Sequence, residues 1–279
     1  MTVLRSLRRG LGGLRRNPIL FVPPFVLMLI EIPQLLLQRS DPLHSLVVSL
    51  LVMLVVLFVL PFFQGGMVGM AAEALDGRTS LATFTREGRA NYVSLFVAYL
   101  VLIAINFVLG IVLFIASLVA VIGLFQAGSV HVGATTPLVA GVIFAAIFLV
   151  YLVVLFFIQF YAQAIVLDDA GATSGFVRSY SLVRQHILST VGFTVVLLVV
   201  GGLLGAVFGA VSILVTPQPY TTLSLPHPST GVLVGVLIGV LAVGTFVGGF
   251  FATYSVAFYR AIDPETAGSA SDEDPARSR

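Results

Sequence analysis

The chain has 279 residues, of which 58% are hydrophobic and 9% charged, a balance typical of proteins that cross a membrane several times. Its 14 Lys and Arg residues are all arginine, the formal net charge is +2, and there is no cysteine. The missing cysteines exclude disulfides, thiolate metal sites and cysteine nucleophiles. The arginines flank apolar runs instead of forming a patch, which argues against nucleic-acid binding.

Residues 1–18 carry five arginines and are expected to anchor the chain at the cytoplasmic face. Leucines between these arginines recur at helical spacing, so a short helix on the membrane surface is one interpretation. Gly10, Gly12 and Gly13 weaken helix formation. The favoured interpretation is therefore an anchor without fixed structure. Asn17 and Pro18 then predict a helix cap and a first-turn proline.

Six apolar runs follow, and each is long enough to cross a hydrocarbon core of about 30 Å. Pro61 and the three glycines that follow it are expected to kink the second run. The predicted fold is all-α, a polytopic membrane domain of six transmembrane helices over residues 19–262. The predicted spans cover residues 19–37, 43–72, 92–125, 138–167, 187–215 and 231–258.

The distribution of arginine predicts the orientation of these spans. If the N-terminus is cytoplasmic, every arginine except Arg39 lies on the cytoplasmic side, as expected for flanks that retain basic residues. Both termini are therefore expected in the cytoplasm, with the protein in the cell (plasma) membrane. Residues 263–279 are rich in acids and small residues and are expected to be a disordered, solvated tail.

Two short interfacial helices are predicted in the cytoplasmic loops, near residues 80–90 and 174–185. In the second, Thr173 or Ser174 is expected to cap the helix, and apolar residues at 4-3-4 spacing form one face: Phe176, Tyr180, Val183 and Ile187. Its arginines either attract anionic lipid headgroups or serve as an orientation signal and as partners in loop ion pairs. The candidate residues of this interface are Asp168, Asp169, Ser174, Arg178 and Arg184.

The segment QAIVLDDAGATSGFVRSYSLVRQHILSTVGF resembles the six-helix membrane domains of glycerophosphodiester phosphodiesterase membrane-domain proteins and their halophilic archaeal relatives. The matching positions are Asp168, Ser174, Arg178, Ser179, Leu182 and Arg184. The chain departs from the pattern at Gln163, near which relatives often have proline, and at Gln185 and His186, where they have a glycine and an aromatic residue. The catalytic barrel is absent, so the resemblance implies a membrane domain with transport-associated or membrane-organising roles and no hydrolase activity.

The second, fourth and sixth spans each reach the cytoplasm at an acid, namely Glu73, Asp168 and Asp263. This spacing indicates a parallel internal duplication, although apolar sequences also align by chance.

Glycine recurs every fourth residue in the last two spans, which predicts a close helix–helix contact of the glycine-zipper kind. A sliding or gating contact is the alternative. The glycines of these stripes are Gly201, Gly205, Gly209, Gly231, Gly235 and Gly239.

Few polar side chains lie inside the predicted spans, and such residues are functional candidates because lipid solvates them poorly. They are Glu31, Asn106, Gln159 and Gln163. Hydrogen bonds between helices are the favoured role for them, and a path for a small polar solute or a proton is the alternative.

The sequence contains no catalytic signature and predicts no metal and no cofactor. A non-catalytic membrane-organising or accessory role is therefore favoured, with the lipid bilayer as a partner and with protein partners and oligomeric state left open. The alternative is a transporter or permease for a small solute, with its path among the first, third and fourth spans. An intramembrane enzyme built on Asp168 and Asp169 is the weaker alternative, because adjacent acids at a helix end point about 100° apart.

Overall fold

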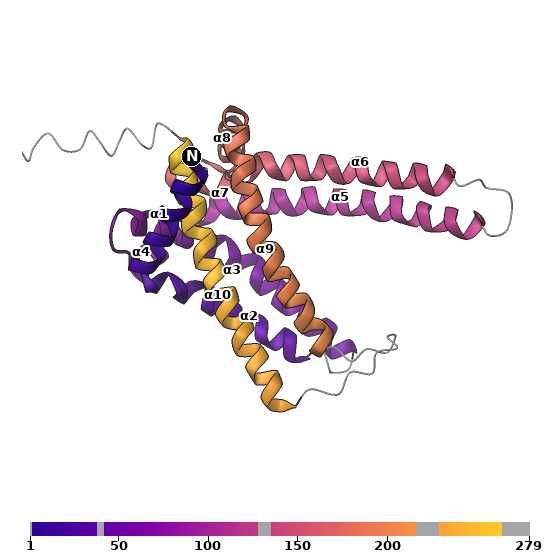
Figure 1. The fold of residues 1–279 in the computed structure, drawn as a ribbon, viewed down its shortest axis with the longest axis horizontal. Helices are drawn as coiled ribbons and strands as arrows, with labels where there is room; N and C mark the ends of the chain where they lie inside the picture. The colour runs from indigo at the N-terminus through magenta and orange to yellow at the C-terminus, as the bar shows by residue number, and fades with distance from the viewer. Residues whose placement is uncertain (1, 38–41, 128–134, 216–228, 264–279) are drawn as a thin grey trace, which may run out of the picture.

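The structure is a computed structural model that describes residues 2–37, 42–127, 135–215 and 229–263. These residues are helical almost throughout, so the predicted all-α class is confirmed (Figure 1). The elements are α1 (Thr2–Arg16), η1 (Pro18–Phe21), α2 (Val22–Leu37), α3 (Pro42–Asp76), α4 (Leu81–Ala90), α5 (Tyr92–Ala127), α6 (Thr135–Ile158), α7 (Tyr161–Leu167), α8 (Ala172–Gln185), α9 (Ile187–Val215) and α10 (Thr230–Ile262).

Five segments of the described chain are long and apolar enough to cross a membrane: Leu46–Asp76, Tyr92–Val119, Gly141–Leu167, Ile187–Gly209 and Val234–Ile262. The predicted first span is shorter, because α2 has 16 residues and α1 meets the segment Pro18–Ile30 at a bend of 96°. At 1.5 Å per residue, α2 is about 24 Å long, less than the thickness of a hydrocarbon core. The described chain therefore has five candidate spans by length and composition, and the sixth remains a prediction.

The short helices α1, α4, α7 and α8 gather at one end of the molecule, which we call the short-helix end (Figure 1). The long helices extend away from it, with α5 and α6 side by side in one direction and α9 and α10 in another. The main buried cluster joins α1, α3, α8, α9 and α10 at this end, through residues such as Leu14, Met70, Leu182, Phe193 and Tyr259. The stable core of the described chain thus lies where the helices converge.

The arginine-rich N-terminus forms a packed helix, so the expectation of an anchor without fixed structure is wrong. A Cβ atom on Gly10 would lie 3.0 Å from Cα of Tyr254 in α10, and one on Gly13 would lie 3.3 Å from the carbonyl oxygen of Ala74 in α3. Glycine at these positions lets the backbones approach. Two of the three glycines that weaken the isolated helix, Gly10 and Gly13, therefore dock it.

The glycines after Pro61 allow α4 to pack closely against α3. The helix α3 continues through Pro61, and a Cβ on Gly66 would collide with Phe84 of α4. Gly88 of α4 makes the reciprocal approach, since its Cβ would lie 2.8 Å from the carbonyl oxygen of Phe62. A helix, α4, is present where an interfacial helix was predicted near residues 80–90, and Ser80 caps it by accepting a hydrogen bond from the Thr83 amide.

The glycine stripes of α9 and α10 do not meet, so the predicted packing contact is not formed. Among the described residues, a Cβ on Gly205, Gly209, Gly235 or Gly239 would have no heavy atom within 4 Å apart from its own stretch of helix, and one on Gly201 or Gly231 would have only a distant neighbour, at 3.9 or 4.0 Å. The two helices instead meet through aromatic rings near the short-helix end. Phe193 stacks on Phe258 with ring centroids 4.5 Å apart and contacts Tyr254 at 4.9 Å. The aromatic contact between α9 and α10 therefore lies outside the two glycine stripes.

Candidate functional site

Arg178 on α8 joins the ends of α7 and α10. Its Nη2 donates to both carboxylate oxygens of Asp263, at 2.9 and 3.2 Å, and its Nε donates to Oδ2 of Asp168 at 3.3 Å. The hydroxyl of Tyr259 donates to the same oxygen of Asp168 at 2.6 Å. We call these four residues the Arg178 cluster. Asp263 is 1% exposed and the Arg178 side chain 32%, so a buried carboxylate is neutralised by a guanidinium that reaches the surface.

Local sequence explains how the two acids reach Arg178. The helix α10 ends at Asp263, whose backbone is extended and whose amide donates to the carbonyl of Tyr259 one turn earlier. A proline follows in the sequence, which favours an extended residue before it. The helix α7 ends at Asp168, and Asp169 turns the chain with a φ of 50°. Asp169 is exposed, so the two adjacent acids diverge, and only Asp168 enters the cluster.

Ser179, the neighbour of Arg178, closes an interruption between α6 and α7. Its Oγ donates to the carbonyl of Phe157 at 2.9 Å and accepts from the amide of Phe160 at 3.0 Å. Both backbone groups are left without a helical partner by the break, and buried groups of this kind require one. The predicted span 138–167 therefore consists of two helices, α6 and α7, which a side chain from α8 joins.

Asn17 ties the junction of α1 and η1 to the end of α3. Its Nδ2 donates to the carbonyls of Gly77 and Ala74 at 2.9 and 3.3 Å, and its Oδ1 accepts from the amide of Thr79 at 3.1 Å. The sequence predicted a helix cap, but its side chain makes no capping hydrogen bond. Asn17 is buried, and it joins two helix ends instead.

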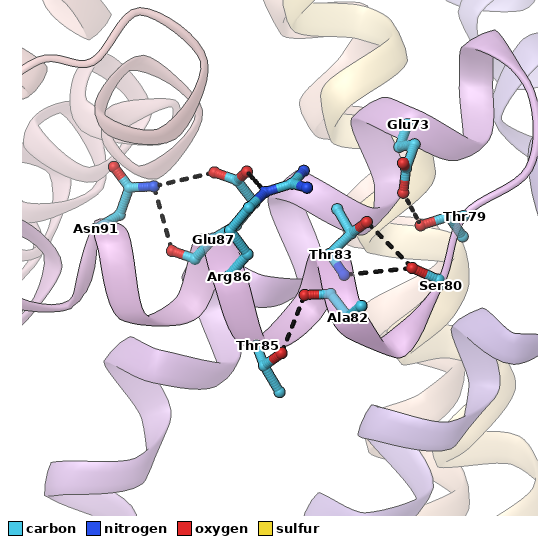
Figure 2. Close-up of polar contacts among 9 residues, drawn as sticks. All are labelled: Glu73, Thr79, Ser80, Ala82, Thr83, Thr85, Arg86, Glu87 and Asn91. Atoms are coloured by element: carbon cyan, nitrogen blue, oxygen red, sulfur yellow. Dashed lines mark hydrogen bonds and ion pairs between the residues drawn. The ribbon is translucent and has the colours of Figure 1, made fainter.

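A second group of polar contacts stabilises the turn from α3 through α4 to α5 (Figure 2). Thr79 donates to Glu73 at 2.8 Å, and Arg86 donates to Glu87 at 3.0 Å. Asn91 Nδ2 donates to the carbonyl and to the carboxylate of Glu87. Each of these contacts joins residues that are close in sequence, so they fix the local turn and do not bring distant helices together.

The structure unites some of the predicted interface residues and separates others. Arg178 and Asp168 form an ion pair, which is one of the two roles expected for this arginine. Ser174 and Arg184 are exposed, and Gly171 caps α8 where Thr173 or Ser174 was expected. The hydroxyl of Ser174 donates to the Gly171 carbonyl at 3.0 Å.

Of the four residues predicted to form an apolar face, Val183 is buried and Phe176 is half-buried in α8, and Ile187 begins α9. Tyr180 and Ile187 are exposed, whereas Gly175, Ser179 and Leu182 are buried. A Cβ on Gly175 would lie 3.2 Å from the carbonyl oxygen of Tyr161, so the helix approaches α7 on its small residues. The spacing of apolar residues cannot predict a helix contact that a glycine and a serine make.

The polar residues of the spans have separate neighbours. Asn106 accepts from the Tyr151 hydroxyl at 2.7 Å, which ties α5 to α6. Gln159 accepts from Thr194 of α9 at 3.2 Å. Tyr151, the partner of Asn106, lies about 12 Å along the helix axis from Gln159. Asn106 and Gln159 therefore do not form one polar patch.

The other two polar residues predicted inside the spans are Gln163 and Glu31. Gln163 is buried, and its Oε1 has no hydrogen-bond partner in the described part of the chain. Glu31 lies in α2, and its side chain is outside the described residues.

Sequence reasoning missed four residues that hold the short-helix end together: Asn17, Ser179, Tyr259 and Asp263. Asp263 was assigned to the solvated tail, which is wrong because the residue is buried. The recurrence of an acid at the end of each even-numbered span could have indicated that Asp263 belongs to the folded part of the chain. Residues 264–279 lie outside the described part of the chain. Within the described residues, no group of three or more His, Cys, Asp or Glu side chains could hold a metal ion.

A family model described as "Domain of unknown function (DUF7847)" matches residues 1–262. The chain belongs to this family. The DUF7847 match contains Asn17 and three residues of the Arg178 cluster, and it ends one residue before Asp263. No curated protein and no solved structure matches the chain.

Proposed function

We propose that this DUF7847 protein is a non-catalytic integral membrane protein with an organising or accessory role. In this proposal six spans cross the plasma membrane, both termini are cytoplasmic, and a second membrane protein binds along the hairpin of α5 and α6. The observation that carries the proposal is the position of this hairpin. The two helices pack on each other and extend away from the rest of the chain (Figure 1).

The hairpin contacts the body at one end. The buried residues of α5 that the structure describes are Leu95 and Ala98, in its first two turns. Further along α5, Phe107 is 67% exposed and Phe114 is 66% exposed. Most of both helices therefore faces lipid or another protein.

The chemistry of this surface fits a transmembrane helix of a partner. No charged residue occurs in Tyr92–Val119 or in Gly141–Leu167. The polar pair Asn106 and Tyr151 is used within the hairpin. What remains outside is apolar surface, which in a bilayer recognises other helices by shape and van der Waals packing.

The resemblance to glycerophosphodiester phosphodiesterase membrane domains belongs to the same proposal. Three residues that carry the resemblance, Asp168, Arg178 and Ser179, join helix ends in the structure. In this proposal a common scaffold accounts for the resemblance at these positions.

Site-specific photo-crosslinking tests the proposal. A photoreactive amino acid replaces Phe107 or Phe114 in cells that express the protein natively, and Leu198 on α9, which is 68% exposed, serves as the matched control. The expected result is one protein adduct of reproducible mass from the hairpin positions and none from Leu198. The partner, identified by mass spectrometry, should then retain the chain in a reciprocal purification and lose it when both phenylalanines are replaced by serine. Lipid adducts alone, equal at all three positions, would contradict the proposal.

A further inference from the structure

An arginine-lined cavity of about 610 Å³ lies between α1, the end of α3 and the end of α10. Its lining includes Arg5, Arg8, Arg9 and Arg16 of α1, Arg260 of α10 and a single acid, Asp76 of α3. We call it the arginine cavity. It is separate from the Arg178 cluster and from the hairpin of α5 and α6.

The fold fixes the position of the helix that carries the α1 arginines. Arg5, Arg9 and Arg16, with Gly12 between them, share one face of α1 by their spacing. Another face of the helix is buried, through Ser6, Gly10, Gly13 and Leu14. Because that face is packed on α10 and α3, the backbone that carries the arginines is held in place, while the side chains of Arg5, Arg8, Arg9 and Arg16 are exposed.

Gly12 leaves the backbone of α1 open. A Cβ at Gly12 would have no heavy atom within 4 Å, whereas one at the neighbouring Gly13 would contact α3. The side of α1 that faces the cavity is therefore unfilled.

The charges of the lining are unbalanced. Asp76 accepts from Nη1 of Arg260 at 2.8 Å, and the same Nη1 lies 3.3 Å from the carbonyl oxygen of Ala72. In the part of the chain that the structure describes, no acid lies within ion-pair distance of Arg5, Arg8, Arg9 or Arg16. Five arginines against one aspartate leave a net charge of +4 around the cavity. Like charges held together repel, and a multiply charged anion relieves that repulsion.

We propose that the arginine cavity binds a phosphate-bearing anion, such as a phosphomonoester or a pyrophosphate group. The planar guanidinium fork donates two parallel hydrogen bonds to phosphate oxygens, which is why arginine is favoured at phosphate sites. The volume lies within the range of small-molecule sites and exceeds what one inorganic phosphate fills. The phosphate belongs either to a free small molecule or to a lipid headgroup, and the chemistry of recognition is the same for both.

Calorimetric titration of the full chain with inorganic pyrophosphate tests the proposal, with the protein in phosphatidylcholine nanodiscs. The test variant is R5Q/R9Q. The control is R15Q/R184Q, which removes the same charge from positions that do not line the cavity. The expected result is saturable binding that weakens by about tenfold or more in R5Q/R9Q and by less than about twofold in the control, since two fork donors are lost only in the former.

A second arm distinguishes the source of the phosphate. Nanodiscs doped with phosphatidic acid are compared with pure phosphatidylcholine nanodiscs, and retained lipid is read by native mass spectrometry. If the headgroup is the ligand, the wild-type chain and the control retain phosphatidic acid, pyrophosphate competes with it, and R5Q/R9Q retains none. If the ligand is a free molecule, pyrophosphate affinity is the same in both kinds of nanodisc.

The proposal is overturned by an absence of saturable binding in both arms, or by equal weakening in R5Q/R9Q and R15Q/R184Q, which would mean diffuse charge attraction. If R5Q/R9Q fails to fold, R5K/R9K takes its place. That variant keeps the charge but loses the fork geometry, so a several-fold weakening is expected, and unchanged affinity contradicts the proposal. None of these outcomes depends on whether a partner binds α5 and α6.

Discussion

Arg178 and Asp263 are 85 positions apart in the chain, yet Nη2 of Arg178 lies 2.9 and 3.2 Å from the two carboxylate oxygens of Asp263. This contact joins α8 to the last residue that the structure describes. Arg178 also reaches Asp168, so one side chain fixes the ends of two long segments relative to each other. The short-helix end is thereby held by charge as well as by the apolar cluster beneath it.

Removing one partner of this ion pair is expected to destabilise the protein strongly. Arg178→Gln leaves the carboxylate of Asp263 buried without its cation, which costs about 3 kcal/mol. The thermal midpoint of the purified protein should fall, as measured by scanning fluorimetry in detergent. The double variant R178Q/D263N should be less destabilised than the sum of the single variants, because it removes both charges. The exposed Arg184→Gln should change stability by less than about 0.5 kcal/mol, and additive single effects in the cycle would contradict the pairing.

Ser179→Ala should loosen the junction of α6 and α7. The substitution removes the hydroxyl that satisfies Phe157 and Phe160, and two buried backbone groups without partners cost about 1–3 kcal/mol. Hydrogen exchange at the Phe160 amide should accelerate, as read by mass spectrometry of peptides that cover the junction. Ser174→Ala is the matched control, because that hydroxyl is exposed and bonds within α8. Equal exchange in the two variants would show that Ser179 does not close the break.

The structure predicts opposite outcomes at two glycines. Gly66→Ala places a methyl group against Phe84 and should destabilise the contact of α3 with α4 by about 1–3 kcal/mol, as overpacking does. Gly205→Ala adds a methyl group to open space and should be neutral or stabilising by up to about 1 kcal/mol, since alanine favours the helix. Thermal unfolding of the two variants provides the comparison. A larger loss of stability in Gly205→Ala than in Gly66→Ala would indicate that the glycines of α9 form a packing face.

Asn17→Ala should release α1 from the end of α3. The substitution removes the acceptor of the Thr79 amide and the donor to Gly77 and Ala74, at a cost of about 3 kcal/mol. Trypsin should then cleave at Arg15 and Arg16 about tenfold faster for each 1.4 kcal/mol lost from the free energy of opening.

Asn91→Ala provides the control for this digestion. Its side chain bonds to Glu87, one turn away, and does not contact α1. The trypsin resistance of α1 should therefore survive the change. Cleavage as fast as in Asn17→Ala would assign the effect to general loss of stability.

Cysteine labelling tests the predicted orientation and the number of spans. The chain has no native cysteine, so each introduced thiol is unique. In intact cells a membrane-impermeant maleimide should label Ser40→Cys and Ser129→Cys, and it should reach Gly77→Cys and Gly171→Cys only after permeabilisation. Labelling of Gly77→Cys and Gly171→Cys from opposite sides is incompatible with the predicted topology. Thr2→Cys should also be reached only after permeabilisation, and its labelling in intact cells would leave five spans instead of six.

The long helices could be predicted from the sequence because apolar runs of sufficient length have few alternatives to spanning helices. The interruption at Gln159 and Phe160 could not, because no proline or glycine marks it. The side chain that closes it comes from Ser179, on another helix. Likewise the glycine pattern of α9 and α10 could not show that these helices meet through Phe193 and its aromatic neighbours.

Of the contacts in the Arg178 cluster, the sequence could predict the one between residues close in the chain. Arg178 and Asp168 are ten positions apart, and an ion pair between them was one of the two roles left open. The contact with Asp263 depends on how α10 returns to the short-helix end, which periodicity does not specify. Asn17 was given the common role of its residue type next to a proline, whereas tertiary contacts gave it another.

The pairing of Arg178 with Asp263 also sets the order in which the molecule can be completed. A ribosome finishes α8 well before it reaches codon 263, so the guanidinium waits for its second acid while α9 and α10 are still being synthesised and inserted. The Arg178–Asp263 contact therefore forms only after α10 has been synthesised, and the short-helix end is the last part of the described chain to be completed.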